Sequence, residues 1–426
     1  MNSHKMYIRR HIDIFLEEWF ENKIRLPLII KGARKTGKSD SIRRFGNRHY
    51  EHFYEVNFEQ EPELAAITNG DFSVEEILGQ LLKLKPDWNF EPNHTLIFFN
   101  EVQACPQILY ALNNFRKEYR FNIIFSGSYF DHEVQADYEL HAIDFEEYLW
   151  WMCYTPEDVD DILNHMVKKI PFASEKLAEL NQHYEDFCHT GGMPESIELF
   201  LKTKAYDESL AFQKDLVQIY RNDIVKYSKR DDIEEILTVF DNIAGQLQKP
   251  FKKFQVTKLK KRARLSQYEG AINWLSYAGI IKFSNYLDLS EGTHYAKEDL
   301  SKYKIYFHDT SLLRPLITAP EDFGAITESL AAETFLKSGM ELCYYKKPAS
   351  TLEEDFLVQT KTGLVPIEVR ITDGNSKALA TLIASEEYSN ITWGIKLYGG
   401  NIKWENKVLY LPRCCGFMVK RMLIVL

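Results

Sequence analysis

Short apolar runs alternate with segments of helical spacing over the first 150 residues of the chain. Four runs are apolar or rich in β-branched and aromatic residues, at 26–30, 53–58, 95–99 and 122–125. Three intervening segments repeat apolar side chains at helical spacing, at 38–48, 74–84 and 106–118. Strands that are apolar throughout are typical of a parallel sheet with helices on both faces. The pattern therefore predicts an α/β fold with a three-layer core.

Beyond residue 145 the pattern changes twice. Helical spacing dominates to about residue 228, with an interruption at the Gly-Gly-Met-Pro sequence of residues 191–194. Helices followed by short strands occupy the segment up to about residue 318, and a helix at 328–338 precedes further β-rich segments. These changes predict domain boundaries near residues 148, 232 and 320.

Composition and charge exclude several classes of protein. The 426 residues are 45% hydrophobic and 27% charged, which is ordinary for a globular protein in water. The net charge of -10 repels nucleic acid, so any nucleic-acid binding needs a local basic patch. We expect no membrane association, because no run of 18 apolar residues occurs. The six cysteines are scattered and no secretory signal is visible, which predicts free thiols and a cytoplasmic location.

A complete phosphate-binding loop follows the first expected strand. It consists of Gly32, Ala33, Arg34, Lys35, Thr36, Gly37, Lys38 and Ser39, which match the pattern GxxxxGK[ST]. In such a loop the glycines let backbone N–H groups surround phosphate oxygens, the lysine reaches the β- and γ-phosphates, and the serine hydroxyl binds Mg²⁺. The helix that follows directs its positive end at the same anion. We therefore expect ATP and Mg²⁺ as ligands.

Polar residues follow the next two strands of the expected core. Asn100 and Glu101 end the apolar run at 95–99, where ATPases of this class carry a metal-steadying acid and a catalytic base. Asn100 can accept a water-mediated metal contact but has no charge, whereas Glu101 can act as the base. Ser126, after the run at 122–125, is either a hydroxyl beside the γ-phosphate or an ordinary turn residue.

The chain resembles a family of bacterial and archaeal AAA+-type ATPases whose C-terminal region is similar to PD-(D/E)XK nucleases. The resemblance covers nearly the whole chain. It rests on GARKTGKS at 32–39, LIFFNEVQACPQIL at 96–109, FSGS at 125–128, DFEEYLW at 144–150, GGMPES at 191–196, IYRNDIVKY at 219–227, KIYFHDTSLL at 304–313 and the series GAITES, EEDFLV and PIEVR between 324 and 370.

The resemblance implies four domains. These are a P-loop ATPase core at 1–148, a helical lid at 149–232, a winged-helix-like domain at 233–320 and an α+β nuclease-like domain at 321–426. The chain departs from the family pattern at Asn100, where Asp is usual, and at Arg370, where Lys is usual. The first departure predicts slow hydrolysis, and the second predicts a nuclease-like domain with little or no nuclease activity.

A basic run crosses the expected winged-helix-like domain. Residues 249–264 contain eight basic residues and no acidic one. A helix-turn-helix unit places its second helix in the major groove and basic neighbours on phosphates, which makes duplex DNA an expected partner. The alternatives are a solvated surface or a contact with another, acidic domain. The candidate DNA-binding residues are Lys252, Lys253, Lys258, Lys260, Lys261, Arg262 and Arg264.

The C-terminal segment carries the acidic set of the nuclease-like domain. Asp355 and Glu368 lie on neighbouring expected strands, and Glu328 lies on the helix before them. The three carboxylates could share a divalent metal. Arg370 lies on the same strand face as Glu368, and it cannot act as a base because it stays protonated. It can instead pair with these carboxylates, which predicts a degenerate site.

Three functions remain open from the sequence. The first is a slow Mg²⁺-dependent ATPase that couples its nucleotide state to domain rearrangement, on DNA or with a protein partner. The second is a nucleotide-dependent binding switch with little hydrolysis. The third is an ATP-regulated nuclease, which would need Arg370 to replace lysine. A homo-oligomer is a further expected state, because AAA+-like cores often act in rings.

Overall fold

The computed structural model describes residues 7, 9–129, 135–290, 297–318, 323–371, 374 and 376–426. The chain forms two compact units. The first comprises residues 1–142, 226–228 and 276–279, and the second comprises 143–225, 229–275 and 280–426. Within the described residues, no helix combines the length and apolar character that a membrane crossing requires.

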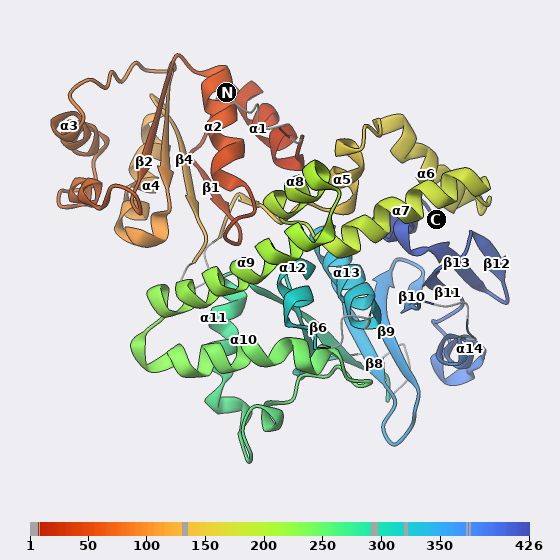
Figure 1. The fold of residues 1–426 in the computed structure, drawn as a ribbon. Helices are drawn as coiled ribbons and strands as arrows, with labels where there is room; N and C mark the ends of the chain where they lie inside the picture. Colours follow the sequence, from red (N-terminus) through yellow and green to blue (C-terminus); the bar gives the residue numbers. More distant parts are fainter. Residues whose placement is uncertain are drawn as a thin grey trace. The chain divides into compact units, whose positions relative to one another are not determined.

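A parallel five-stranded sheet forms the centre of the first unit (Figure 1). Its strands are β1 (Leu28–Lys31), β2 (His52–Asn57), β3 (Thr95–Asn100), β4 (Asn122–Gly127) and β5 (Tyr138–Glu139). The order across the sheet is β2-β3-β4-β1-β5, and each neighbouring pair is parallel. Because β4 lies between β1 and β3, residues at the carboxyl ends of these three strands share one edge.

Two apolar clusters cover the two faces of this sheet. On one face, Ile30, Phe98 and Ile124 pack against α1 (His11–Glu21) and α2 (Lys38–His49). On the other face, the alternate residues Ile29, Phe99 and Phe125 pack against α3 (Val74–Leu84) and α4 (Leu112–Glu118). Alternation of side chains along each strand thus places apolar residues on both faces. The three-layer α/β core expected from the sequence is confirmed.

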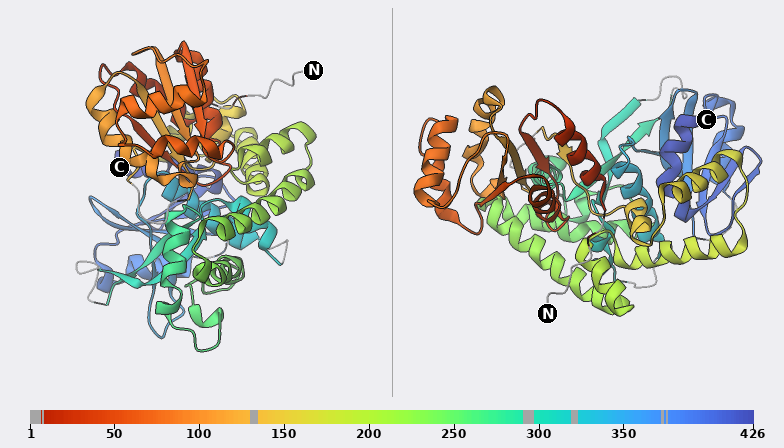
Figure 2. Two further views of the ribbon diagram at one scale, coloured as in Figure 1. Left: turned by 90° about the vertical axis from the view of Figure 1, so that its left-hand side faces the viewer. Right: turned by 90° about the horizontal axis from the view of Figure 1, so that it is seen from above.

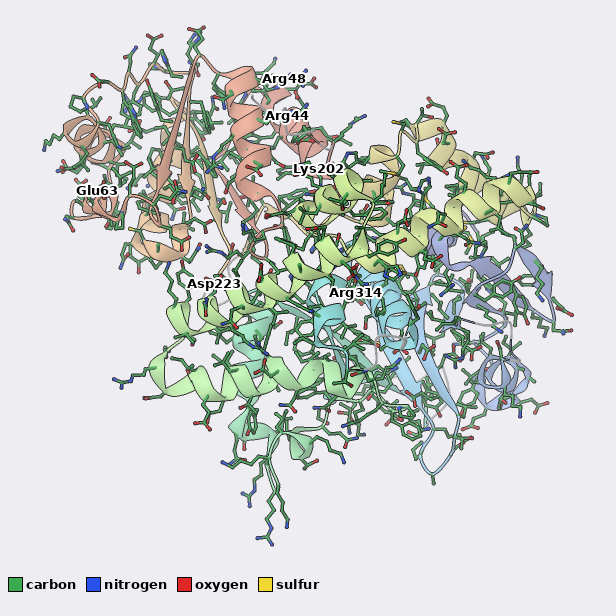
Figure 3. The ribbon with its side chains drawn as sticks, in the orientation of Figure 1. Arg44, Arg48, Glu63, Lys202, Asp223 and Arg314 are labelled. Carbon is green, nitrogen blue, oxygen red and sulfur yellow. The ribbon has the colours of Figure 1, made fainter. Side chains whose placement is uncertain are left out.

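The exposed side of α2 carries basic residues. Arg44 and Arg48, one turn apart on α2, project from the same side of the helix (Figure 3). Arg48 lies 3.5 Å from Glu17 of α1 in an exposed ion pair. Ile42 and Phe45 of the same helix are buried in the core.

The second unit begins with helices and continues into a mixed sheet (Figures 1 and 2). The helices are α5 (Phe145–Trp151), α6 (Pro156–Lys168), α7 (Ser174–Thr190), α8 (Pro194–Thr203), α9 (Tyr206–Tyr227), α10 (Ile233–Leu247) and α11 (Glu269–Tyr277). The last residues of α9 and of α11 are part of the first unit. Both helices therefore belong partly to each unit.

One eight-stranded sheet follows, with helices α12 (Thr310–Leu313), α13 (Phe323–Lys337), α14 (Lys377–Ala384) and α15 (Val419–Val425). Its strands are β6 (Ile281–Asp288), β7 (Lys297–Phe307), β8 (Cys343–Lys346), β9 (Glu353–Thr360), β10 (Gly363–Val369), β11 (Gly394–Tyr398), β12 (Lys403–Glu405) and β13 (Val408–Pro412). Their order is β12-β13-β11-β10-β9-β8-β6-β7.

The sheet joins segments that the sequence assigns to two domains. The β6–β7 hairpin belongs to the expected winged-helix-like segment, and β6 pairs in parallel with β8 of the expected nuclease-like segment. The expected boundary at residue 320 lies outside the described residues. The finer division into lid, winged-helix-like and nuclease-like domains stays a prediction, since all three segments contribute to the second unit.

Candidate functional site

The phosphate loop joins β1 to α2 through a backbone that requires glycine. Gly37, the residue before α2, has φ 97°, in the left-handed region that favours glycine. A Cβ at Gly32 would lie 2.2 Å from the carbonyl oxygen of Leu140. The Thr36 hydroxyl donates to the Ala33 carbonyl at 2.9 Å and closes the loop internally. The two motif glycines thus have separate roles, one in backbone conformation and one in close packing.

Lys38 lies inside this loop. Its ammonium donates to the carbonyl oxygens of Gly32 at 2.8 Å and Ala33 at 2.9 Å, and to the Ser128 hydroxyl at 2.9 Å. Burial lowers the pKa of Lys38 to about 8, and the nearby Glu101 carboxylate opposes that shift. A buried ammonium with neutral oxygen partners is poised to bind an anion.

Asn100 meets Ser39 and Ser126 at the shared edge of the sheet. Its Oδ1 accepts from the Ser39 hydroxyl at 3.2 Å, the Ser126 hydroxyl at 3.3 Å and the Glu101 backbone N–H at 3.0 Å. The structure thus brings together three sequence-predicted site residues. Ser126 is fully buried and contacts Asn100, whereas the hydroxyl that reaches Lys38 belongs to Ser128.

Glu101 follows β3 with a left-handed backbone, at φ 55° and ψ 47°. The Gln103 amide donates to its Oε2 at 2.6 Å, and the Oε1 of Gln103 accepts from the Ser128 N–H at 3.2 Å. Left-handed backbone in a residue other than glycine is uncommon, and such residues cluster at functional sites. Gln103 therefore fixes the side chain expected to act as base.

Glu55 is a site residue that the sequence analysis missed. Its Oε1 accepts from Asn100 Nδ2 at 2.8 Å, and Arg43 of α2 donates two hydrogen bonds to its carboxylate at 2.6 and 2.8 Å. Burial alone would raise the pKa of Glu55, but Arg43 and Asn100 hold it below its ordinary value. The available signal was an acidic residue that follows Phe53 and Tyr54 and precedes Val56 within the run at 53–58.

A second carboxylate links the loop to the end of α9. Arg34 Nη1 lies 3.2 Å from Glu59 Oε2, while Glu59 Oε1 accepts from Tyr227 OH at 3.1 Å and pairs with Lys226. Tyr227 also stacks on Tyr129, with ring centroids 5.1 Å apart. Glu59 thus contacts both the phosphate loop and the part of α9 that belongs to the first unit.

The family comparison agrees with this geometry. Residues 25–149 match the model of a family described as an AAA domain. The first unit is an AAA+-type P-loop domain. A second model, described as a domain of unknown function, matches residues 181–322. No curated protein sequence matches the chain significantly.

Two solved structures are similar to parts of the chain. The Walker-type ATPase PABY2304 of Pyrococcus abyssi is 12% identical, with 73% of this chain and 96% of that chain covered and a TM-score of 0.45. The ORC1 protein of Aeropyrum pernix, solved in complex with DNA, is also 12% identical, with 79% and 95% covered and a TM-score of 0.31.

Arg370 bridges two members of the C-terminal acidic set. Its guanidinium lies 3.0 Å from Asp355 Oδ2 and 2.7 Å from Glu368 Oε1. Asp355 Oδ2 also accepts the Val369 N–H at 3.0 Å. The carboxylates are buried, whereas the Arg370 side chain is 43% exposed. The arginine thus contacts the oxygens that a metal would need.

Cations also surround the third member, Glu328. Lys304, which is 1% exposed, lies 3.3 Å from Glu328 Oε1, and Lys252 pairs with the other oxygen. Tyr306 OH donates to the carboxylate at 2.8 Å. Burial alone would raise the pKa of Glu328, but the two lysines hold it well below its ordinary value. Within the described residues, Glu328, Asp355 and Glu368 do not form a group whose oxygens all lie within 4.8 Å of one another.

A buried glutamate near this set was also missed by the sequence analysis. Glu354 is fully buried on β9, and in the described part of the chain neither of its carboxyl oxygens has a hydrogen-bond partner. Burial and the neighbouring Glu368 and Asp355 raise its pKa well above the ordinary value. A neutral carboxyl here avoids adding another negative charge to the set.

The basic run divides into two parts in the structure. Lys252 and Lys253 are half-buried, and Lys252 is engaged by Glu328. The remaining candidates for DNA binding are exposed around the short turns before α11: Lys258, Lys260, Lys261, Arg262 and Arg264.

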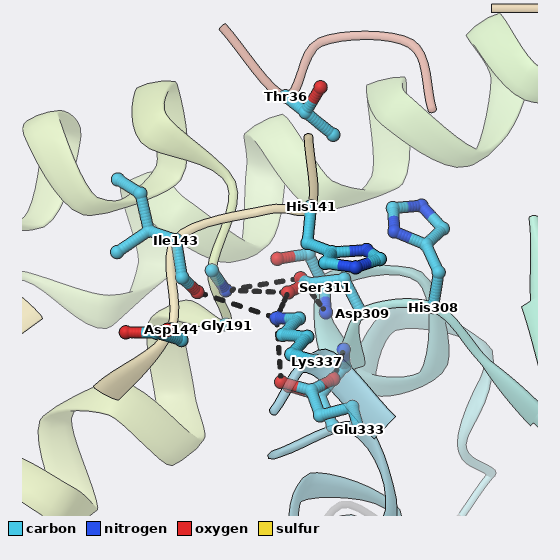
Figure 4. A network of polar contacts seen from close by, with 12 residues as sticks. Thr36, His141, Ile143, Asp144, Gly191, His308, Asp309, Ser311, Glu333 and Lys337 are labelled. Atoms are coloured by element: carbon cyan, nitrogen blue, oxygen red, sulfur yellow. Dashed lines mark hydrogen bonds and ion pairs between the residues drawn. The ribbon is translucent and has the colours of Figure 1, made fainter. Parts of the chain in front are cut away.

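The Gly-Gly-Met-Pro sequence meets the segment after β7 in a buried polar network (Figure 4). The Gly192 N–H donates to both carboxylate oxygens of Asp309, at 3.1 and 3.0 Å. Lys337 of α13 lies 3.2 Å from Asp309 and 3.3 Å from Glu333, and the Glu333 carboxyl accepts from the Thr310 N–H at 2.7 Å. The Gly-Gly-Met-Pro sequence and the segment after β7, which are far apart in sequence, therefore share one buried network of polar contacts.

Proposed function

We propose that the AAA+-type domain binds ATP with Mg²⁺ and hydrolyses it slowly. The observation that carries the proposal is the convergence of Lys38, Ser39 and Asn100 at one edge of the parallel sheet. Ligands in open α/β sheets bind outside the carboxyl ends of the strands, where this edge lies. The complete loop sequence supplies the phosphate-binding chemistry.

The residues present fit Mg²⁺. The Ser39 hydroxyl and Asn100 Oδ1 are oxygen donors 3.2 Å apart, and Mg²⁺ prefers oxygen ligands. When bound, the ion would neutralise phosphate charge. On this proposal Lys38 exchanges its carbonyl partners for phosphate oxygens, Ser39 holds the metal, and Asn100 and Ser126 steady the surrounding oxygens.

We expect slow ATP hydrolysis because of the residues at positions 100 and 101. Glu101 can take a proton from the attacking water, but its carboxylate is already held by Gln103 at 2.6 Å. Asn100 brings no charge toward the metal. Both features would reduce the rate of ATP hydrolysis without abolishing it.

Two variants test the assignment. Lys38→Ala removes the phosphate-facing charge and is expected to weaken ATP binding at least tenfold, about 1.4 kcal/mol. Glu101→Gln is expected to bind ATP normally and to release no phosphate above background. Fluorescent-nucleotide titration and steady-state phosphate release measure these effects. Equal ATP affinity in Lys38→Ala and wild type would overturn the proposed nucleotide site.

A series of contacts connects the phosphate loop to the end of α9, and through it a bound nucleotide could affect that helix. Arg34 of the loop pairs with Glu59, which contacts Lys226 and Tyr227 at the end of α9. Most of α9 belongs to the second unit. Phosphate would compete with Glu59 for Arg34 and would thereby release or reorder the end of this helix. Such competition would couple the nucleotide state to a rearrangement of the domains.

The binding switch is the second candidate function. It is favoured by the amide at Asn100 and the engagement of Glu101 by Gln103. A switch would bind ATP tightly, change the environment of α9 and release phosphate no faster than Glu101→Gln. Phosphate release above that variant would favour the slow ATPase.

A further inference from the structure

The side-chain amide of Asn100 has one orientation that satisfies all of its neighbours. Ser39, Ser126 and the Glu101 N–H all donate to Oδ1. On the other side, Nδ2 donates to a carboxylate oxygen of Glu55 at 2.8 Å. Rotation of the amide by 180° would place an oxygen against this carboxylate and N–H groups against the donors. Asn100 therefore presents its oxygen to Ser39 because Glu55 holds its nitrogen.

Glu55 is itself rigidly placed. Strand β2 runs parallel to β3, with Glu55 opposite Phe98 and Asn57 opposite Asn100. Arg43 binds both carboxylate oxygens, and the Glu55 side chain is 19% exposed. Two charge-assisted hydrogen bonds of this kind fix the carboxylate in position and keep it ionised.

We propose that Glu55 is the positioning residue of the metal-facing edge, and that Glu55 and Asn100 form a unit replacing a single aspartate. The inference rests on the proposed Mg²⁺·ATP function. The amide supplies the oxygen near Ser39, and the carboxylate selects the orientation in which it does so. The unit also accounts for the absence of aspartate at position 100, since two carboxylates would otherwise face each other across a hydrogen-bonding distance.

If Glu55 and Asn100 act as a unit, an aspartate at position 100 should weaken binding of Mg²⁺·ATP. Asn100→Asp alone removes the donor to Glu55 and places like charges together, so Mg²⁺·ATP binding is expected to weaken at least tenfold. Adding Glu55→Gln supplies an amide that donates to the introduced aspartate while its oxygen still accepts from Arg43. The double variant is expected to return to within about threefold of the wild-type affinity.

Four proteins test the unit: wild type, Glu55→Gln, Asn100→Asp and the double variant. ATP affinity is measured for each with Mg²⁺ and with a chelator, and thermal unfolding is measured on the same samples. The weaker binding of Asn100→Asp and its recovery in the double variant are expected with Mg²⁺ only. Lys38 is unchanged in all four proteins, so binding of ATP without the metal should be the same. Glu51→Gln, an exposed change just before β2, is the matched control and is expected to bind as wild type.

The outcomes separate the inference from the proposed function. Wild type that fails to bind ATP under both conditions would contradict the function itself. Wild type that binds ATP, with Asn100→Asp as tight as wild type or with purely additive effects in the double variant, would overturn only the Glu55–Asn100 unit. Glu55→Leu removes the carboxylate that accepts from Asn100 Nδ2, and loss of Mg²⁺ dependence in this folded variant would further support positioning.

Discussion

At the scale of single residues, the two candidate sites differ in how their charges are balanced. Lys38 is buried against neutral oxygens, and burial lowers its pKa to about 8. Arg370 pairs at close range with two carboxylates. The first arrangement leaves a positive charge that an anion can satisfy, whereas the second is already balanced. We therefore expect the Lys38 site to bind an anion and the Arg370 site to bind a metal ion poorly.

ATP affinity is expected to depend on pH through Lys38. In the free protein the ammonium loses its proton above about pH 8, whereas bound phosphate would hold the proton at higher pH. Binding above pH 8 then requires proton uptake, so affinity is highest below this pH and falls about tenfold per unit above it. Titrations from pH 7 to 9.5 measure the slope. Lys38→Ala should show no such slope, and a flat wild-type profile would contradict the assignment.

The C-terminal acidic set is expected to bind Mn²⁺ poorly and not to cut DNA efficiently. Arg370 offers a planar fork to two carboxylates, whereas lysine at this position would be a compact point charge without that fork. Arg370→Lys is therefore expected to raise Mn²⁺ affinity, and Asp355→Ala in that background should abolish the gain. Calorimetry and a plasmid-cleavage assay provide the readouts. Strong wild-type cleavage that is lost in Asp355→Ala would restore the nuclease hypothesis.

At the scale of elements, the turn between α7 and α8 is held by the segment after β7. Gly191 has φ 62°, and a Cβ there would lie 2.1 Å from the Ser311 hydroxyl oxygen. A Cβ at Gly192 would lie 2.6 Å from Asp309 Oδ2. The Gly-Gly sequence therefore permits close approach of two elements, in addition to forming a turn.

Gly191→Ala is expected to destabilise the second unit by at least about 2 kcal/mol, through a left-handed backbone and a steric conflict with Ser311. Gly245→Ala is the matched control, since Gly245 lies in α10 and its Cβ would meet nothing within 4 Å. Alanine there should stabilise the helix by roughly 0.5–1 kcal/mol. Thermal unfolding distinguishes the two, and equal midpoints would refute the packing argument.

At the scale of the whole molecule, a net charge of -10 opposes nucleic-acid binding, while the exposed part of the basic run favours it locally. Lys258, Lys260 and Lys261 are exposed near the turn before α11. Phosphate contacts from such residues would give weak duplex binding without strong sequence preference. Lys252 is excluded from this proposed surface, because Glu328 holds it.

Charge reversal of Lys258, Lys260 and Lys261 together is expected to reduce duplex binding. It should also flatten the salt slope by up to about 2.7, at roughly 0.9 for each lost phosphate contact. Reversal of the exposed Lys202, Lys204 and Lys214 is the control with the same change in net charge. Fluorescence anisotropy at several salt concentrations measures both. Equal slopes in the two triple variants, or no wild-type binding at low salt, would remove the DNA hypothesis.

The sequence alone predicted several helices and strands of the AAA+-type core close to their bounds in the structure. The helix predicted at 74–84 is α3 itself, and the strands predicted at 95–99 and 122–125 lie within β3 and β4. These features depend on residues that are neighbours in the chain: apolar runs of strand length, and a loop whose ligands lie within eight positions. Local interactions decide them, so local patterns predict them.

Only the tertiary structure decided which charged groups face one another. Glu55 and Asn100 are 45 residues apart, and Gly192 and Asp309 are 117 apart. The sequence predicted slow hydrolysis from the missing charge at Asn100, whereas the contact between its amide and Glu55 is visible only in the structure. Such contacts depend on strand order and register, where a shift of one residue moves a side chain to the other face of a sheet. No pattern along a single strand contains that information.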